Sequence, residues 1–132
     1  MTRFLLALPL LLATVPAIAQ DRPARLAANI SYEARGVSPG WQLAIGDRIA
    51  LRMDPDADGF AIRQYFPRAR SRSVEGVRRW ESRSAGGAVM TIEARRAPCT
   101  LGELTFRDTV TIVQGDRRLA GCGGPRVSGN DG

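Results

Sequence analysis

The chain has 132 residues and a formal net charge of +6, and every basic residue is an arginine because the sequence contains neither lysine nor histidine. The absence of histidine excludes Ser-His-Asp and Cys-His nucleophiles and imidazole metal sites, and the absence of lysine excludes Schiff bases and Walker-type phosphate loops. Any catalysis would have to use carboxylates, hydroxyls, tyrosines or arginines, so we expect a protein that is not an enzyme.

The first 19 residues have the pattern of a secretory signal peptide. Arg3 supplies a short basic region, residues 4–14 form an apolar run, and residues 15–19 end in the small-x-small sequence that signal peptidase recognises. The apolar run is shorter than the roughly 20 residues needed to span a bilayer. The residue directly after Ala19 is Gln20 and not a cysteine that could carry a lipid. We therefore expect a soluble, periplasmic mature protein of 113 residues that begins at Gln20 and is not lipidated.

The mature chain begins with an irregular leader, residues 20–28, and continues as a single β domain predicted over residues 29–124. Apolar and polar residues alternate around Ile30–Ala34, which predicts a first strand. The strongest local signal is a β-hairpin over Trp41–Met53, whose alternating strands flank a two-residue turn at Gly46-Asp47.

The rest of the domain continues the pattern of short strands between turn residues. We predict a turn at 54–59, an exposed loop at 67–73, turns at 86–87 and 114–116, and strands over 60–66, 74–82, 89–94, 104–113 and 117–122. The Gly- and Ser-rich residues 125–132 are predicted to be a disordered tail. These signals predict an all-β fold, a small antiparallel barrel or sandwich of about seven or eight short strands.

The mature chain contains two cysteines, Cys99 and Cys122. An even number of cysteines in an exported chain predicts a disulfide. The alternative is a redox-active pair, but the two residues do not form a Cys-x-x-Cys motif. A structural bridge over this loop length contributes about 3 kcal/mol to stability.

Three aspartates, Asp54, Asp56 and Asp58, precede Gly59 in the pattern that opens a calcium-binding loop. Such a loop needs a bidentate glutamate at position twelve, where this chain has Tyr65. The alternative is an ordinary β-turn, because Asp and Gly are favoured turn residues. We therefore expect no metal or other cofactor, and calcium affinity no tighter than about the millimolar range.

An arginine-rich stretch and two tryptophans are the candidate ligand-binding residues. In an extended chain, alternate arginines point the same way and could clamp phosphates or carboxylates, and exposed tryptophans could stack on sugar rings. The alternatives are a solvated loop and tryptophans that belong to the core. The candidates are Trp41, Arg68, Arg70, Arg72, Arg78, Arg79 and Trp80.

Two segments of the chain resemble a family of small bacterial envelope proteins that is related to segments accompanying META domains in lipoproteins. The first is a G-x-x-P-x-W segment before a hairpin, and the second contains a cysteine pair around alternating apolar residues. The family's D-G-M-S-D portion is replaced here by 100–104. The resemblance implies an envelope β domain and no particular activity. The matching residues are Gly36, Pro39, Trp41, Cys99, Val110, Ile112, Leu119, Gly121 and Cys122.

These observations favour a non-enzymatic periplasmic binding or interaction module of the cell envelope. Its expected partner is an anionic envelope component or another envelope protein, and export argues against nucleic acid. One alternative is a lysozyme inhibitor, which the chain resembles in architecture only; a basic inhibitor would meet a basic enzyme unfavourably. The other is a hydrolase, although nothing in the sequence pairs its candidate carboxylates, Glu33, Glu81, Glu93 and Glu103.

Overall fold

The computed structural model describes residues 26–55 and 61–127, so the predicted signal peptide and the candidate ligands Asp56 and Asp58 lie outside the described residues. All regular structure within these ranges is β-strand, and no helix in this part of the chain is long and apolar enough to cross a membrane. The strands are β1 (Tyr32–Val37), β2 (Gly40–Ile45), β3 (Arg48–Met53), β4 (Ile62–Pro67), β5 (Arg72–Val74), β6 (Val77–Arg83), β7 (Val89–Leu101), β8 (Leu104–Gln114) and β9 (Arg117–Arg126).

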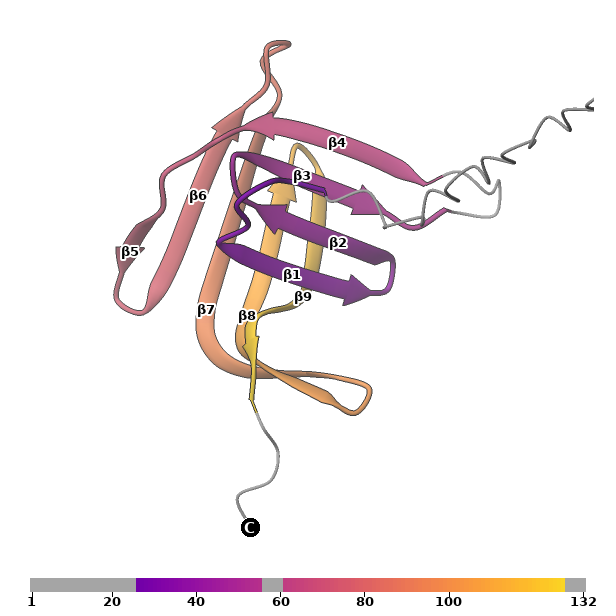
Figure 1. Ribbon diagram of the computed structural model, residues 1–132, viewed down its shortest axis with the longest axis vertical. Coiled ribbons are helices and arrows are strands. Elements are labelled where there is room, and N and C mark those ends of the chain that lie inside the picture. Colours follow the sequence, from indigo (N-terminus) through magenta and orange to yellow (C-terminus); the bar gives the residue numbers. More distant parts are fainter. Residues whose placement is uncertain (1–25, 56–60, 128–132) are drawn as a thin grey trace, which may run out of the picture.

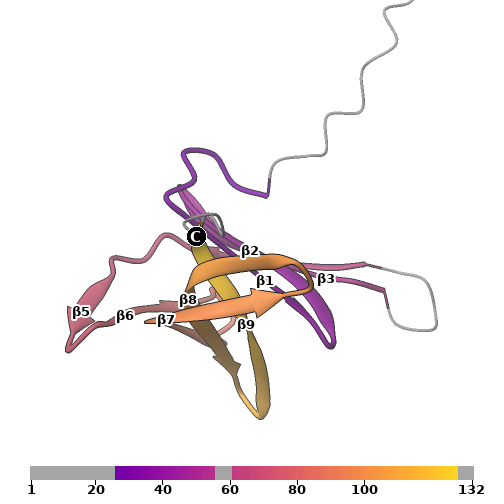
Figure 2. The same ribbon diagram turned by 90° about the horizontal axis from the view of Figure 1, so that it is seen from below.

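The nine strands form one antiparallel sheet in the order β4-β3-β2-β1-β9-β8-β7-β6-β5. Only β1 and β9 are neighbours without being consecutive in the chain. Figures 1 and 2 show the sheet curled into a half-barrel, with β1–β4 running across the direction of β6–β9. The predicted all-β antiparallel fold is confirmed, with nine strands rather than seven or eight.

The core lies inside the curl and is built by the alternation of apolar residues along each strand. The two halves of the sheet meet where the rings of Tyr32 and Trp80 pack with centroids 4.9 Å apart. Between β6 and β4, Ser82 Oγ donates a hydrogen bond of 2.6 Å to the carbonyl of Pro67. The largest fully buried side chains include Trp41, Leu43, Ile49, Leu51, Trp80, Met90, Ile92 and Ile112.

The predicted hairpin over Trp41–Met53 is present as β2 and β3, but its turn is longer than expected. Ile45 pairs with Ile49, which leaves three residues between them instead of two. The segment before β1 explains the difference. Ala28 N and Asp47 Oδ1 form a hydrogen bond of 2.9 Å, Asp47 N donates to Ala28 O at 2.9 Å, and Arg48 Nε donates to Leu26 O at 3.0 Å. The turn is therefore shaped by a tertiary contact.

The predicted single strand over 74–82 is wrong, because a turn at Glu75-Gly76 divides it into β5 and β6. Both turn residues have positive φ, 51° and 77°, as a two-residue hairpin turn of type I′ requires. Asn or Asp usually precedes the glycine in such turns, so glutamate gave no turn signal. Arg72 and Ser73, predicted to lie in a loop, belong to β5.

The last three strands are longer than predicted, and the β7–β8 hairpin bends sharply (Figure 1). The bend coincides with register shifts between Arg96 and Cys99 on β7 and between Phe106 and Asp108 on β8. β9 runs to Arg126, two residues beyond the predicted end of the domain.

The predicted disulfide between Cys99 and Cys122 is present, with Cα atoms 5.3 Å apart. It joins β7 to β9, although β8 lies between them in the sheet. Strands on either side of a third are normally separated by about twice the 4.8 Å strand spacing. The bend in the β7–β8 hairpin therefore accounts for the close approach of the two cysteines.

Candidate functional site

On three neighbouring strands, every second side chain points into the half-barrel and forms a series. Each of these series finishes with a charged residue, and the three charged residues lie on the same side of the half-barrel. On β6 the series that contains Trp80 ends in Arg78, and on β7 the apolar series ends in Arg96. On β8 Asp108 is the last residue of the series that contains Val110 before the register shifts toward Phe106. Register brings these ends together: Arg78 pairs with Ala94, which pairs with Val110, and Arg96 pairs with Asp108 in the next row. The apolar interior thus opens into a polar, mostly basic mouth.

These residues line a hollow of about 640 Å³, which we call the Arg78 hollow. Two hydroxyls from the β5 side, Ser71 and Ser73, face it together with the charged residues. Arg78 also lines two adjoining hollows, one shared with Arg68 and Arg70 and the other with Tyr32 and Glu33. The charged residues that line the Arg78 hollow itself are Arg78, Arg96, Arg107 and Asp108.

Asp108 is the one buried carboxylate among the described residues, with 3% of its surface exposed. Arg107 donates to it from Nε and Nη2, both at 2.9 Å, and the Tyr32 hydroxyl donates at 2.8 Å. Burial raises the pKa of Asp108, but the hydrogen bonds from Arg107 and Tyr32 and the positive charges of Arg107 and Arg96 lower this pKa by more. Asp108 is therefore ionised at neutral pH.

The Tyr32 hydroxyl remains a donor to this carboxylate across the whole neutral range. Burial, the hydrogen bond to Asp108 and the negative charge of Asp108 all raise the pKa of Tyr32 above its ordinary value. The guanidinium of Arg107 is likewise held in its charged form, because its hydrogen bonds to Asp108 raise its pKa. Tyr32, Arg107 and Asp108 form a fixed network beside the hollow.

We expect Asp108→Asn to destabilise the protein at pH 7 by about 1 to 3 kcal/mol, because a charged hydrogen-bond acceptor is lost from a buried network. The pKa of Asp108 is lower in the folded state than in the unfolded chain, where it is about 3.9. Its stabilising contribution is thus fully present above about pH 4 and is lost as the pH falls through the folded pKa. Urea unfolding at pH 7 and pH 3 should show the difference between wild type and variant shrinking at the lower pH.

Asp116→Asn is the matched control for this experiment, because Asp116 is exposed in the turn between β8 and β9. We expect it to have little effect at either pH. An Asp108→Asn penalty of the same size at pH 3 and pH 7 would contradict a role for the ionised carboxylate.

Arg78 and Arg96 carry the uncompensated charge of the hollow. Within the described ranges, no carboxylate oxygen lies within 4.0 Å of either guanidinium, whereas Arg107 is paired with Asp108. The Arg78 guanidinium stacks 4.6 Å from the ring centroid of Trp80 and 6.0 Å from that of Tyr32. These contacts orient Arg78 and leave its donors free for a ligand. Three arginines and one aspartate give the charged lining a net charge of +2.

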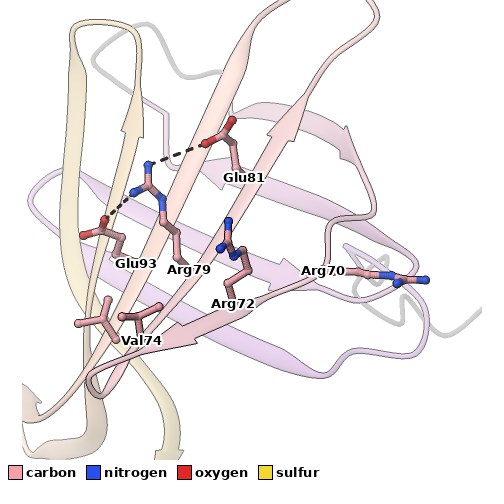
Figure 3. Close-up of a pocket in the computed structure, with 7 residues that line it drawn as sticks. Arg70, Arg72, Val74, Arg79, Glu81 and Glu93 are labelled. Carbon is pink, nitrogen blue, oxygen red and sulfur yellow. Dashed lines mark ion pairs between the residues drawn. The ribbon is translucent and has the colours of Figure 1, made fainter.

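A second hollow, of about 660 Å³, lies on the opposite, outer face of β5, β6 and β7 (Figure 3). Its central residue, Arg79, lies 3.8 Å from Glu81 and 3.7 Å from Glu93, in exposed ion pairs. Figure 3 shows Arg70 extending away from Arg72 and Arg79. Exposed pairs of this kind contribute little energy. Of the three arginines that line this second hollow, only Arg79 is in an ion pair among the described residues, and the charged lining has a net charge of +1, one less than that of the Arg78 hollow.

The structure therefore divides the predicted basic stretch between two faces. Arg72 and Arg79 belong to the outer hollow and Arg78 to the inner one. Arg68 shares a hollow with Arg70 and Arg78 but does not line the outer one. Arg70 lines the outer hollow with Arg72 and the adjoining hollow with Arg68, so the three alternating arginines of the predicted stripe do not line one hollow together.

Both tryptophans that were predicted as exposed stacking platforms are buried. Trp41 is 1% exposed and Trp80 is 2% exposed. The Trp41 indole donates from Nε1 to the carbonyl of Ala120 at 3.3 Å, and Trp80 lies beneath Arg78. Their role as core residues, the alternative considered above, is the one that the structure supports. Trp80 lies beneath Arg78 and also lines the adjoining hollow that Arg78 shares with Arg68 and Arg70.

The candidate carboxylates are dispersed, except that Glu81 and Glu93 share Arg79. Glu33 lies on β1 and Glu103 in the turn between β7 and β8. Among the residues that the structure describes, no group of three His, Cys, Asp or Glu side chains could hold a metal ion. The calcium-loop prediction is not tested by this, because two of its three aspartates lie outside the described residues.

Sequence reasoning missed Arg96, Arg107, Asp108 and the role of Tyr32. A signal was present for Asp108, which occupies the same alternating phase as the buried residues Val110 and Ile112. A charged residue in the inward phase of a strand requires partners inside the fold. Those partners could not be identified from the sequence, because they depend on the order of the strands in the sheet, which the local pattern of apolar and polar residues does not determine.

Comparisons of the chain with protein-family models, curated proteins and solved structures found no match. The family resemblance described above stays a prediction.

Proposed function

We propose that this protein is a non-enzymatic binding module that acts in the periplasm and recognises an anionic component of the cell envelope. The observation that supports this most directly is the Arg78 hollow, where two guanidiniums face a concave surface without carboxylate partners among the described residues. Guanidinium groups match the geometry of phosphates and carboxylates, so an anionic group is the complementary ligand.

The location rests on the signal-like first 19 residues and on the disulfide. The pattern at Ala19 favours export. The bridge between Cys99 and Cys122 is compatible with an oxidising compartment, where disulfides form and persist.

The state of the one carboxylate in the Arg78 hollow supports the proposed non-enzymatic role. Both oxygens of Asp108 accept hydrogen bonds, and its lowered pKa makes it a weak base. A general base works best with a pKa near the working pH, and a nucleophile needs a free oxygen. Asp108 is poorly suited to act as a general base, and its hydrogen bonds hold Arg107 in place.

The proposal is tested by binding of the purified mature chain to vesicles made from bacterial envelope extract and to vesicles of zwitterionic lipid alone. We expect retention on the envelope vesicles that falls steeply between about 50 and about 300 mM NaCl, because contacts between exposed charges are screened by salt. Equal binding to both kinds of vesicle, or binding unaffected by salt, would contradict an anionic partner.

A further inference from the structure

We propose that the Arg78 hollow is a binding site for a phosphate monoester, held by the guanidiniums of Arg78 and Arg96. This inference rests on the proposed function, because it names the ligand chemistry of the same surface. It commits to the dianionic phosphate group on a sugar or a lipid headgroup, in preference to a carboxylate or a phosphate diester.

Charge balance distinguishes these ligand classes. Arg78, Arg96 and Arg107 with Asp108 leave the hollow at +2. A phosphate monoester carries about −1.5 to −2 at pH 7, so it neutralises this excess. A carboxylate or a phosphate diester carries a single negative charge and leaves one arginine uncompensated. The lining therefore complements a dianion better than a monoanion.

The hydrogen-bond donors of the hollow also suit a group with three terminal oxygens better than a carboxylate, which has two. The two guanidinium forks come from neighbouring strands, β6 and β7, and the hydroxyls of Ser71 and Ser73 come from the β5 side. A phosphate monoester offers three terminal oxygens, whereas a carboxylate offers two. A tetrahedral group can thus engage donors from three sides of the hollow.

Asp108 does not neutralise the positive charge that Arg78 and Arg96 present to a ligand, because both of its oxygens already accept hydrogen bonds from other residues. Arg107 donates to both of them, and Tyr32 donates to Oδ2. The negative charge of Asp108 is thereby paired with Arg107. Arg78 is held instead against the rings of Trp80 and Tyr32. Asp108 and Tyr32 are positioning residues, and Arg78 and Arg96 are the ligand contacts.

The size of the hollow indicates that the phosphate is attached to something larger. About 640 Å³ falls within the range of small-molecule pockets, about 300 to 1,000 Å³. Adjoining hollows continue from Arg78 toward Arg70 and toward Glu33. A sugar or glycerol unit that carries the phosphate has room to lie along either of them.

Arg95 provides a matched control on the same strand. It precedes Arg96 and points to the opposite face, where it pairs with Val77 and Thr109. Arg95→Gln removes the same charge from the protein as Arg96→Gln. Any difference between the two variants therefore reports the position of the charge and not the net charge.

The experiment is a calorimetric titration of the mature chain with glucose 1-phosphate, with dimethyl phosphate and acetate as monoanionic comparisons. We expect glucose 1-phosphate to bind most tightly. Arg78→Gln and Arg96→Gln should each weaken its binding about tenfold or more, as expected for loss of a charged hydrogen bond, and Arg95→Gln less than about twofold. Circular dichroism of each variant verifies that the fold is retained; Arg96, which is exposed, keeps the test valid if Arg78→Gln fails to fold.

A second arm uses vesicles that contain phosphatidic acid, a lipid monoester, against vesicles that contain phosphatidylglycerol, a diester. Binding that prefers phosphatidic acid and depends on Arg96 supports a lipid-borne phosphate, whereas binding of glucose 1-phosphate alone supports a soluble or glycan-borne one. The proposal is overturned if neither monoester binds, or if Arg96→Gln and Arg95→Gln weaken binding equally.

Failure of this proposal is distinguishable from failure of the proposed function. Salt-sensitive binding to envelope vesicles that is equally affected by Arg95→Gln and Arg96→Gln would leave an anionic partner but exclude this site. Binding of glucose 1-phosphate that depends on Arg96, without any retention on envelope vesicles, would retain the site and exclude the envelope partner.

Discussion

Replacing both cysteines, as Cys99→Ser with Cys122→Ser, is expected to lower the melting temperature by about 10 °C or more, while the cold protein keeps its β-type circular dichroism. A disulfide over a loop of this length contributes about 3 kcal/mol through the unfolded state. For a domain of roughly 100 residues, each 1 kcal/mol shifts the melting temperature by about 4 to 8 °C. The sheet itself is built from hydrogen bonds and a core that do not involve the bridge, so the fold should persist when cold.

The position of the bridge adds a local reason for a large effect. It ties the bent part of β7 directly to β9, across β8, and Cys122 is fully buried. The register shifts on either side of the bend lie next to Arg96 and Asp108, which line the Arg78 hollow. Loss of the bridge should therefore loosen the edge of that hollow as well.

Two measurements check this prediction. Differential scanning calorimetry gives the melting temperatures, and reduction of the wild type with dithiothreitol should reproduce the value of the double variant. Free-thiol titration of the unfolded, unreduced protein should find no thiols. Two titratable thiols, or an unchanged melting temperature in the double variant, would show that the pair is not a structural bridge.

The parts of the fold that could be predicted are those specified by short-range pattern. The alternation of apolar residues from Trp41 to Met53 predicted β2 and β3, although Ala44 and Ala50 in the opposite phase are buried as well. The disulfide followed from the even number of cysteines and the signal-like N-terminus. In each case the information lay within a few residues or in composition.

The parts that could not be predicted depend on contacts between distant segments. The turn at Glu75-Gly76 lacks the usual Asn or Asp, and the turn after Ile45 is set by Leu26 and Ala28. The extension of β7 beyond Ala94 runs through Pro98, a residue that ordinarily ends a strand. Pro98 lies in the irregular stretch between Arg96 and Cys99, where the β7–β8 register shifts, and such a bulge is one of the positions in a sheet that tolerate proline.

The candidate site was predicted only in part, for the same reason. Arg78 was recognised within the basic stretch, but Arg96 and Asp108 lie on other strands and were not connected to it. Their proximity follows from the order β6-β7-β8 and from a register that a single sequence does not determine. Conversely, Arg72 and Arg79, close to Arg78 in the sequence, lie on the other face.

Gly121→Ala is expected to destabilise the protein by about 3 kcal/mol or more, the upper part of the range for overpacking a core. A Cβ at this position would meet the backbone carbonyl oxygen of Arg35 and would lie 2.6 Å from Trp41 Cζ2. The carbonyl belongs to β1, which pairs with β9, so it cannot move without disturbing the one connection that joins the two ends of the chain in the sheet.

The clash also falls on Trp41, one of the two tryptophans of the core. Trp41 is 1% exposed and lies between Gly121 and Gly36, where an added Cβ would also meet the indole. The two glycines thus leave the space that the indole occupies. If Trp41 is displaced, the hydrogen bond from its Nε1 to the Ala120 carbonyl is lost as well. Steric and polar costs therefore act in the same direction.

Gly86→Ala is the matched control, because a Cβ there would have only Ser84 Oγ within 4 Å, at 3.9 Å. The same substitution, free of clashes, is expected to change stability by less than about 1 kcal/mol, and in the stabilising direction, since alanine reduces the entropy of the unfolded chain. Urea unfolding followed by tryptophan fluorescence measures both variants. Similar unfolding midpoints for Gly121→Ala and Gly86→Ala would mean that β9 is not packed against Trp41 and β1. The pairing of β1 with β9, which joins the two parts of the sheet, would then be wrong.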